Sequence, residues 1–234
     1  MRKKTKDLKK IIKKHYKLII VFICLILVME IIGDLIAKEV MTKDVIGYQI
    51  ISKYLICDSI TPIAKFITNF GGVVFLIASA IILLIIIKNK TVGGFVCLNL
   101  ALSAGLNQLL KHIVQRPRPT EYRLIDESGY SFPSGHSMVS AAFYGFLIYL
   151  IFKNVKNKYI KSISITLLSL LVCLIGISRI YLGVHYTSDV LAGFLISILY
   201  LIIFTSIVDN YLEDDKEENQ IEDVKRQENE LQMQ

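Results

Sequence analysis

Hydrophobic residues gather in long runs with almost no charge, separated by short polar stretches. The clearest runs are Leu18–Met29, Val73–Ile87 and Val190–Ile207. With their flanks these runs reach the length of about 20 residues that a helix needs to cross a bilayer. Because lipid offers the backbone no hydrogen-bond partner, a spanning segment must satisfy its own polar groups as a helix. The pattern therefore predicts an all-α protein that crosses the membrane several times.

We predict a bundle of six transmembrane helices. The expected spans are about Leu18–Ala37, Phe66–Ile87, Val92–Val114, His136–Phe152, Ile160–Ile180 and Asp189–Val208. They divide the chain into a basic cytoplasmic segment at residues 1–17, a six-span domain at residues 18–208 and a charged cytoplasmic tail at residues 209–234. The tail is expected to be a solvated helix or disordered. Residues 45–66 are expected to form a connecting helix or to lie along the membrane interface.

The placement of basic residues predicts the orientation in the cell membrane. The formal net charge is +7, and Lys and Arg are dense in residues 1–17, before the first span. Lysines also lie between spans two and three and between spans four and five, and such residues mark the cytoplasmic side. Both termini are therefore expected in the cytoplasm, with residues 38–65, 115–133 and 181–188 outside. The lysines within residues 38–65 run against this assignment.

The basic charge does not predict a nucleic-acid partner, because no base-reading motif accompanies it. The N-terminal segment instead suits the anionic headgroups of a phospholipid bilayer. The first span follows a basic region, as a cleaved signal peptide does. Ala37 is a weak cleavage candidate, so an uncleaved anchor is the favoured interpretation.

Neither the cysteines nor the acidic residues in the spans predict a metal site. Cys24, Cys97 and Cys173 lie in apolar runs and Cys57 stands alone in a loop, as expected of cysteines that pack as small hydrophobic residues. Glu30 and Asp34 are four residues apart in the first span, the spacing of a metal or acid–base pair. Interfacial or helix–helix contacts are the favoured interpretation of that pair.

Three polar clusters interrupt the hydrophobic pattern, and all three fall at the predicted outer face. They are residues 111–119 (KHIVQRPRP), 133–136 (PSGH) and 178–189 (SRIYLGVHYTSD). The orientation rests on lysines alone, so the shared side of the clusters supports it independently. We therefore expect the clusters to form one site.

The first and third clusters bring three cations toward one region, which is unfavourable unless an anion binds among them. These are Lys111, Arg118 and Arg179. Arginine binds phosphate oxygens through a bidentate fork, whereas lysine acts as a point charge. Each residue alone also fits an interfacial side chain that reaches toward water. Together they favour an anion site.

The second cluster has the features of a helix start. Ser134 fits the N-cap position, and the free N–H groups of a helix N-terminus bind anions with the help of the helix dipole. Gly135 lets the backbone approach a ligand closely. An N-cap alone does not account for His136.

His185 and Asp189 are four residues apart, so they share a helical face if the sixth helix begins early enough. A carboxylate that accepts the N–H of one ring nitrogen leaves the other nitrogen free as a nucleophile. His136 then suits protonation of the leaving oxygen. A purely structural pair is the alternative for His185 and Asp189 in isolation. Two histidines beside three cations favour phosphoryl transfer.

The clusters resemble the three motifs of the type 2 phosphatidic acid phosphatases, which share a fold with the vanadium-dependent haloperoxidases. Those motifs read K-x6-R-P, P-S-G-H and S-R-x5-H-x3-D. The matching residues, in order, are Lys111, Arg118, Pro119, Pro133, Ser134, Gly135, His136, Ser178, Arg179, His185 and Asp189. Arg116–Pro117 makes a second R-P pair that lacks the spacing from Lys111. The resemblance covers residues 111–189, and spans two to six agree in layout.

This resemblance implies an acid phosphatase/haloperoxidase-like core and a metal-independent lipid phosphatase. His185 would attack phosphorus to form a phosphohistidine, Asp189 would orient it, and His136 would protonate the departing lipid oxygen. No metal or other cofactor is implied, since the cations supply the positive field and no carboxylate cluster suits Mg²⁺. The phosphate-binding and charge-stabilising residues would be Lys111, Arg118, Ser134, Gly135 and Arg179.

An outer site with lateral access from lipid suits undecaprenyl diphosphate, phosphatidylglycerol phosphate or phosphatidic acid. The motifs bind phosphate and not the lipid tail, so they do not choose among these. The short six-span form and residues 129–132 resemble bacterial members, for which undecaprenyl diphosphate is the favoured substrate. Alternatives are a phosphotransferase that uses an acceptor lipid and a non-catalytic transporter or scaffold, while haloperoxidase chemistry is disfavoured. The oligomeric state stays open.

Overall fold

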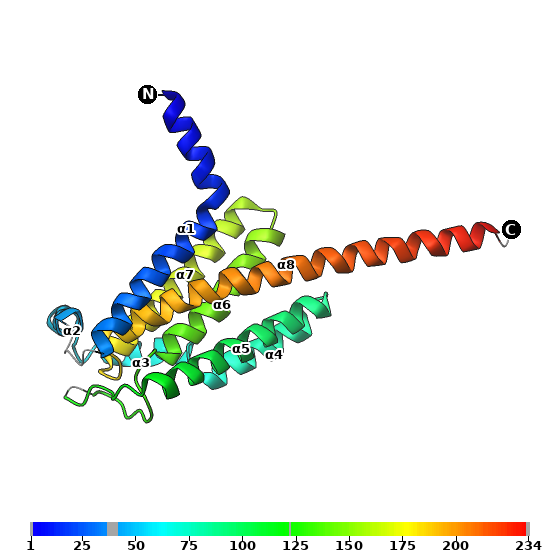
Figure 1. The fold of residues 1–234 in the computed structure, drawn as a ribbon. Helices are drawn as coiled ribbons and strands as arrows, with labels where there is room; N and C mark the ends of the chain where they lie inside the picture. Colours follow the sequence, from blue (N-terminus) through cyan, green and yellow to red (C-terminus); the bar gives the residue numbers. More distant parts are fainter. Residues whose placement is uncertain (1, 37–41, 122, 233–234) are drawn as a thin grey trace.

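The computed structural model describes residues 2–36, 42–121 and 123–232, which form helices and no strand (Figure 1). The helices are α1 (Arg2–Ile36), α2 (Thr42–Tyr54), α3 (Thr61–Asn69), α4 (Val73–Ile86), α5 (Lys90–Val114), α6 (Gly135–Asn154), α7 (Lys158–Tyr181) and α8 (Thr187–Gln232). The predicted all-α fold is confirmed.

Within the described residues, five helices are long and apolar enough to cross a membrane, or six spans if α3 and α4 count as one bent span. The five are His15–Leu35, Lys90–Val114, Gly135–Asn154, Lys158–Tyr181 and Thr187–Glu213. They agree with the predicted spans to within a few residues. The hydrophobic runs therefore locate these helices well.

The second predicted span, Phe66–Ile87, is wrong as a single helix. Phe66 lies in α3, and the chain bends by 45° before α4 begins at Val73. Gly71 and Gly72 lie at the break. A Cβ on Gly71 would lie 2.7 Å from the Ile175 side chain and 3.3 Å from Cδ2 of His136. The bend thus brings backbone close to the start of α6, where a larger residue would clash.

Helix α6 lies at the centre of the bundle and packs against α5, α7 and α8. Lipid tails are as apolar as the side chains, so packing in a bilayer depends on close approach and interhelical hydrogen bonds. A Cβ on Gly193 of α8 would lie 3.2 Å from the Met138 nitrogen. One turn later, Ser197 Oγ donates to the Met138 carbonyl at 2.7 Å. These two small residues hold the start of α8 against the start of α6.

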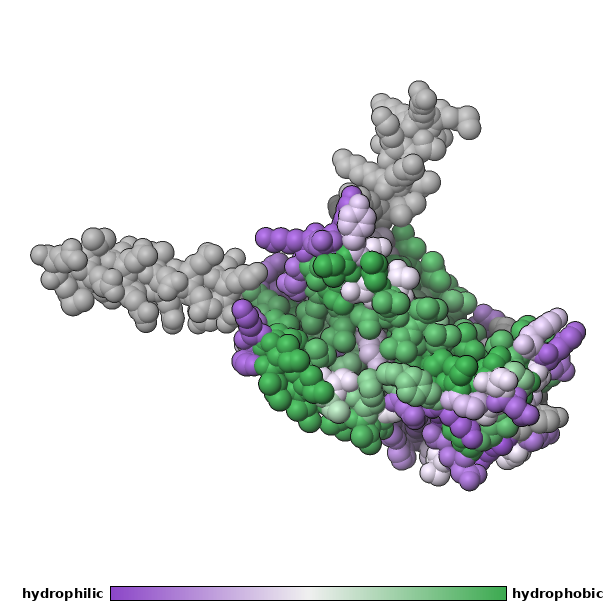
Figure 2. All heavy atoms as spheres, turned by 180° about the vertical axis from the view of Figure 1, so that it is seen from behind, coloured by the Kyte–Doolittle hydropathy of each residue, from purple (hydrophilic) through white to green (hydrophobic). Residues whose placement is uncertain are grey.

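The bundle presents apolar side chains along its middle and polar ones at its ends. Figure 2 shows hydrophobic residues over most of one face, with hydrophilic residues gathered toward the ends. At the end away from α2 and α3, Lys90 donates to the Leu84 and Ile85 carbonyls at 3.0 and 2.8 Å. Lys161 donates to the Phe152 carbonyl at 2.8 Å. These lysines satisfy carbonyls that a helix C-terminus leaves without partners.

No break marks the predicted boundaries at residues 17/18 and 208/209. Helix α1 runs continuously from Arg2, and α8 continues to Gln232, well beyond the bundle (Figure 1). The tail was expected to be a solvated helix or disordered, and its backbone is helical up to Gln232. Residues 45–66 form most of α2 and the first part of α3. Helix α2 packs on α7 and α8.

Candidate active site

The three polar clusters meet at one end of the bundle, because each lies where a helix begins or ends. Lys111 is in the last turn of α5, Ser134 caps α6, and Arg179 is in the last turn of α7. His185 lies between α7 and α8, and Asp189 is in the first turn of α8. The expected single site is therefore present in the fold.

His185 and Asp189 lie side by side, although the condition for a shared helical face, an early start of the sixth helix, is not met. Helix α8 begins at Thr187, so His185 precedes it. The final loop residues nevertheless place His185 Nδ1 at 3.5 Å from Asp189 Oδ2. The loop is held in place by the Tyr186 N–H, which donates to the same carboxylate oxygen at 2.9 Å. The expected pair of side chains therefore forms across the end of a loop and not along a helix.

The Asp189 carboxylate is fully buried and accepts hydrogen bonds on both oxygens. Ser131 Oγ donates to Oδ2, and Arg116 Nη1 donates to Oδ1 at 2.6 Å. The Asp189 carbonyl also accepts from the Ser134 N–H at 3.1 Å. The second and third clusters are thus joined directly through this residue.

The second ring nitrogen of His185 faces Arg118. Arg118 Nη1 lies 3.0 Å from His185 Nε2 and donates to the Val184 carbonyl at 2.9 Å. Arginine carries only donors, so this contact fits a ring whose Nε2 is an unprotonated acceptor and whose Nδ1 carries hydrogen toward Asp189. That tautomer leaves a lone pair on the nitrogen that faces the cations.

Arg118 and Arg179 share one carboxylate partner that sequence reasoning missed. Glu127 Oε2 lies 3.2 Å from Arg118 Nη2, and Glu127 Oε1 lies 2.7 Å from Arg179 Nη2. Arg179 is buried and also donates to Thr68 Oγ1 at 2.8 Å, while its Nε has no hydrogen-bond partner among the described residues. A buried donor without a partner is unfavourable, so Arg179 retains capacity for an anionic ligand.

The start of α6 lies directly against Lys111 and α5. Ser134 Oγ accepts from the Ser137 N–H at 3.4 Å, which confirms the predicted N-cap. A Cβ on Gly135 would lie 3.0 Å from Asn107 Oδ1, so only glycine fits here without displacement. Asn107 donates to the Pro133 carbonyl at 3.2 Å, and Lys111 Nζ donates to the Tyr130 carbonyl. These contacts fix the helix N-terminus beside the lysine.

Two further residues escaped the sequence reasoning, Arg116 and Asp44. Arg116 was set aside as a second R-P pair, yet its guanidinium bridges Asp189 and Asp44 of α2, at 2.6 and 2.7 Å. The repeated R-P pair was the available signal for Arg116. Asp44 offers no signal in the sequence, because only the fold brings α2 to this place.

Burial and charge together set the protonation of the loop residues. Burial lowers the pKa of His185 to about 4, although the Asp189 carboxylate opposes this change. Burial also lowers the pKa of Arg118, against the opposing effect of Glu127. Burial alone would raise the pKa of Glu127, but the charge and hydrogen bond of Arg179 lower it. At neutral pH the site thus holds a neutral His185 and an ionised Glu127.

A cavity of about 820 Å³ connects the polar site to the apolar side of the bundle. His185, His136, Lys111 and Arg118 line its polar end, and it continues between α4 and α5 past Leu76 and Leu100. Arg179 and Asp189 lie behind these residues and do not line it. The cavity can take a molecule with an anionic head and an apolar tail.

The described residues contain no group of three or more His, Cys, Asp or Glu side chains placed to hold a metal ion. The acidic side chains of the site instead pair with arginines. Glu127 pairs with Arg118 and Arg179, and Asp44 and Asp189 pair with Arg116. The excess positive charge faces the cavity, where Lys111 and Arg118 lie.

Comparison with known proteins also identifies the part of the chain that contains the three clusters. A family model described as the PAP2 superfamily matches residues 93–213, which include all three clusters. Phosphatidylglycerophosphatase B of Bacillus subtilis (strain 168) is 43% identical over 96 residues, or 40% of this chain and 47% of that protein. Sphingosine-1-phosphate phosphatase 1 of Rattus norvegicus is 42% identical over 110 residues, or 44% of this chain and 25% of that protein. The matches span about half or less of these curated relatives.

Among solved structures, the fold is similar to that of the transmembrane PAP2 type phosphatidylglycerolphosphate phosphatase from Bacillus subtilis. The TM-score is 0.69 with 27% sequence identity, over 84% of this chain and 97% of that chain. The similarity therefore extends beyond the three clusters to most of the helical bundle.

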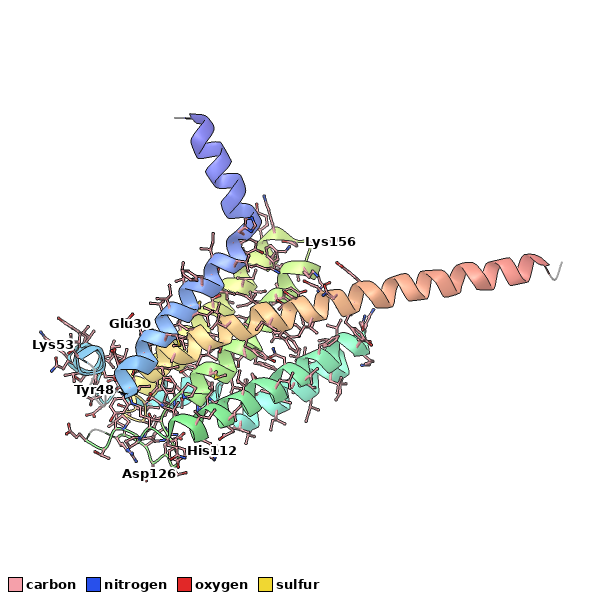
Figure 3. All side chains as sticks on the ribbon, in the orientation of Figure 1. Glu30, Tyr48, Lys53, His112, Asp126 and Lys156 are labelled. Carbon is pink, nitrogen blue, oxygen red and sulfur yellow. The ribbon has the colours of Figure 1, made fainter. Side chains whose placement is uncertain are left out.

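Replacing Glu127 by Gln should strengthen the binding of inorganic phosphate by about two- to fivefold, because an amide no longer competes for Arg118 and Arg179. Isothermal titration calorimetry on the purified protein measures the Kd. Asp126→Asn, the same change at an exposed neighbouring position (Figure 3), is the matched control and should leave the Kd unchanged. A weaker affinity in Glu127→Gln would show that Glu127 organises the arginines instead of competing for them.

Proposed function

The chain belongs to the PAP2 superfamily, and from that membership we propose that it is a membrane lipid phosphatase or diphosphatase acting through a phosphohistidine. The observation that carries the proposal is His185. Its Nδ1 lies against a buried carboxylate, and its Nε2 lies 3.0 Å from an arginine on the wall of the cavity. A histidine held in this way is a nucleophile directed at a bound phosphate.

In the proposed reaction, phosphate binds against Lys111, Arg118 and the N-terminus of α6, which face the cavity, and Arg179 supports it from behind them. These groups stabilise the charge that develops on the phosphoryl oxygens in the transition state. The phosphorus atom takes the place beside His185 Nε2 that Arg118 now occupies. Glu127 gives up its arginine partners to the phosphate oxygens.

His185 Nε2 forms a bond to phosphorus as the bond from phosphorus to the lipid oxygen breaks. His136, which lines the same cavity, gives its proton to that oxygen. A water molecule then attacks phosphorus, and His136 accepts a proton from it. The nitrogen–phosphorus bond breaks, inorganic phosphate leaves, and His185 is neutral again. The Asp189 carboxylate stabilises the positive imidazole ring of the intermediate.

The proposed mechanism uses no metal ion. In many phosphoryl transfers a divalent cation neutralises the phosphate oxygens. Here Lys111 and two arginines would neutralise these oxygens, and Glu127 is the carboxylate that pairs with both arginines among the described residues. The proposal therefore needs no cofactor.

We propose a lipid with a terminal phosphate as the substrate, entering sideways between α4 and α5. The apolar length of the cavity supports a lipid over a water-soluble ester. The relative named phosphatidylglycerophosphatase B supports phosphatidylglycerol phosphate. Undecaprenyl diphosphate, which the short bacterial form favours, and phosphatidic acid fit the same polar end.

We propose that both termini are cytoplasmic and that the site faces outward. The support is the distribution of charge. The lysines that cap α4 and α6 lie at the end of the bundle opposite the site, and Lys156 lies there too (Figure 3). Short basic connections of this kind mark the cytoplasmic side.

Phosphate release from a lipid panel by the detergent-purified protein tests the activity. Release should persist in EDTA and fall by at least about 10³-fold in His185→Ala, while His15→Ala, at the other end of the bundle, should leave it unchanged. The panel holds undecaprenyl diphosphate, phosphatidylglycerol phosphate, phosphatidic acid and a water-soluble ester. Release that rises only with an added acceptor lipid would indicate phosphotransfer. No release from folded protein would refute a catalytic role.

Histidine-selective NMR tests the charge state of the nucleophile. The chain has four histidines, and the signal lost in His185→Ala identifies the residue. Burial disfavours the imidazolium form, so this signal should stay in its neutral form as pH falls and protonate only near pH 4. Titration near the ordinary value of about 6.5 would mean that water reaches the ring freely.

The orientation predicts that a membrane-impermeant maleimide labels Cys57 in intact cells. Cys57 is exposed between α2 and α3, at the end that carries the site. In a Cys57→Ser background, the Lys156→Cys variant is the matched control and should be labelled only after lysis. Labelling at position 156 in intact cells would reverse the proposed orientation.

A further inference from the structure

Helix α2 lies outside the residues matched by the family model, yet it supplies a buried charge to the back of the site. Asp44, in the first turn of α2, has a side chain only 2% exposed. Its Oδ2 accepts from Arg116 Nη2 at 2.7 Å and from Ser188 Oγ at 3.0 Å. Its Oδ1 accepts from the Ser188 N–H at 2.8 Å. Asp44 thus caps the N-terminus of α8 from another helix.

Arg116 connects this carboxylate to Asp189. One guanidinium nitrogen donates to Asp189 Oδ1 and to Ser188 Oγ, at 2.6 and 2.8 Å, and the other donates to Asp44. The guanidinium also lies over the Tyr186 ring, 3.9 Å from its centroid. Burial alone would lower the pKa of Arg116, but Asp189 and Asp44 raise it. Arg116 is therefore a permanent cation between two buried carboxylates.

Three buried charges of alternating sign lead to the neutral ring of His185, the proposed nucleophile. In order the four residues are Asp44, Arg116, Asp189 and His185, with side-chain exposures of 2%, 11%, 0% and 1%. Buried charges are stable when each has a partner, and removing one partner leaves another uncompensated. Each of these residues therefore acts on the next.

The position of Asp44 depends on a contact between α2 and α8. A Cβ on Gly47 would overlap Thr187 Oγ1, so α2 lies directly on the first turn of α8. Asp44 is less than one turn away from Gly47, and Ser188 follows Thr187. The contact between the two helices therefore sets the position of the Asp44 carboxylate.

We propose that Asp44, acting through Arg116, is a positioning residue that tunes the Asp189–His185 pair. The inference rests on the proposed function, in which His185 becomes positively charged when it bonds to phosphorus. Asp189 stabilises that charge. Arg116 weakens this stabilisation, because it pairs with the same carboxylate. Asp44 offsets the arginine and leaves Asp189 available to the histidine. Since Asp44 does not touch the cavity that holds the phosphate, its effect falls on kcat and not on KM.

Removing the charge of Asp44 and removing the charge of Arg116 should shift the pKa of His185 in opposite directions. Asp44→Asn leaves Arg116 uncompensated beside Asp189, which should lower the pKa by about one unit. Arg116→Gln removes the cation, so Asp189 should hold the proton of His185 more strongly and raise the pKa. The double variant should return it toward the wild-type value. These variants leave in place the other charged and titratable groups that the described part of the chain brings to this site. They are Arg118, Arg179, His136, Glu127 and Lys111.

The experiment measures this pKa by histidine-selective NMR, together with kcat and KM for the lipid that wild type hydrolyses best. Asp44→Asn should lower kcat by about 10- to 100-fold, the range known for loss of the outer partners of metal-ligating histidines, with KM unchanged. Asp44→Glu keeps the charge and should recover most of kcat. Asp58→Asn, the same change at an exposed position just after α2, is the matched control and should behave as wild type.

A purely structural role for Asp44 gives a different result. It would reduce the folded fraction and leave the pKa of His185 unchanged in the folded protein. Shifts of the same sign in Asp44→Asn and Arg116→Gln, or no shift in either, would overturn the proposal. If Asp44→Asn does not fold, Arg116→Gln alone decides through the direction of its shift. Activity that survives His185→Ala would instead refute the proposed mechanism, so the two failures are distinguishable.

Discussion

The buried carboxylate of Asp189 is the interaction on which the site depends. It faces His185, accepts hydrogen bonds from Ser131 and the Tyr186 N–H, and pairs with Arg116. The backbone carbonyl of Asp189 accepts a hydrogen bond from the Ser134 N–H. A fully buried carboxylate is stable only with such a set of partners. Meeting that requirement brings the start of α8 and the α5–α6 loop together, and the contacts of Ser134 and Asp44 add α6 and α2 to the same place.

The membrane restricts a site built on irregular backbone to the ends of the helices. Helices in lipid must satisfy all their backbone groups, so irregular backbone belongs at their ends. The loop between α5 and α6 uses that freedom and contributes Arg116, Arg118, Glu127 and Ser131. The cavity then links these polar groups to the apolar space between α4 and α5. One opening thus serves both the charged and the apolar part of a lipid phosphate.

Local pattern was enough to locate most helices but not their interruptions. Hydrophobic runs predicted the spans that became α1, α5, α6, α7 and α8, since uncharged length is a property of one segment. The bend before Val73 was not predicted, because apolar residues lie on both sides of it. The sixth span was expected from about Asp189, close to the observed start of α8 at Thr187, and this start leaves His185 outside the helix. There the Tyr186 N–H bonds to Asp189 outside any helix.

The sequence by itself determined the all-α membrane class and the family. It also indicated which residues form one site, because the spacing within a short motif can be recognised without the fold. These residues are Lys111, Arg118, His136, Arg179, His185 and Asp189. Only the tertiary structure decided what surrounds those residues. Asp44 lies 72 residues from Arg116 in the chain, and Glu127 lies 52 from Arg179. Their pairing arises from the neutralisation of buried cations, which depends on helix packing and leaves no local pattern.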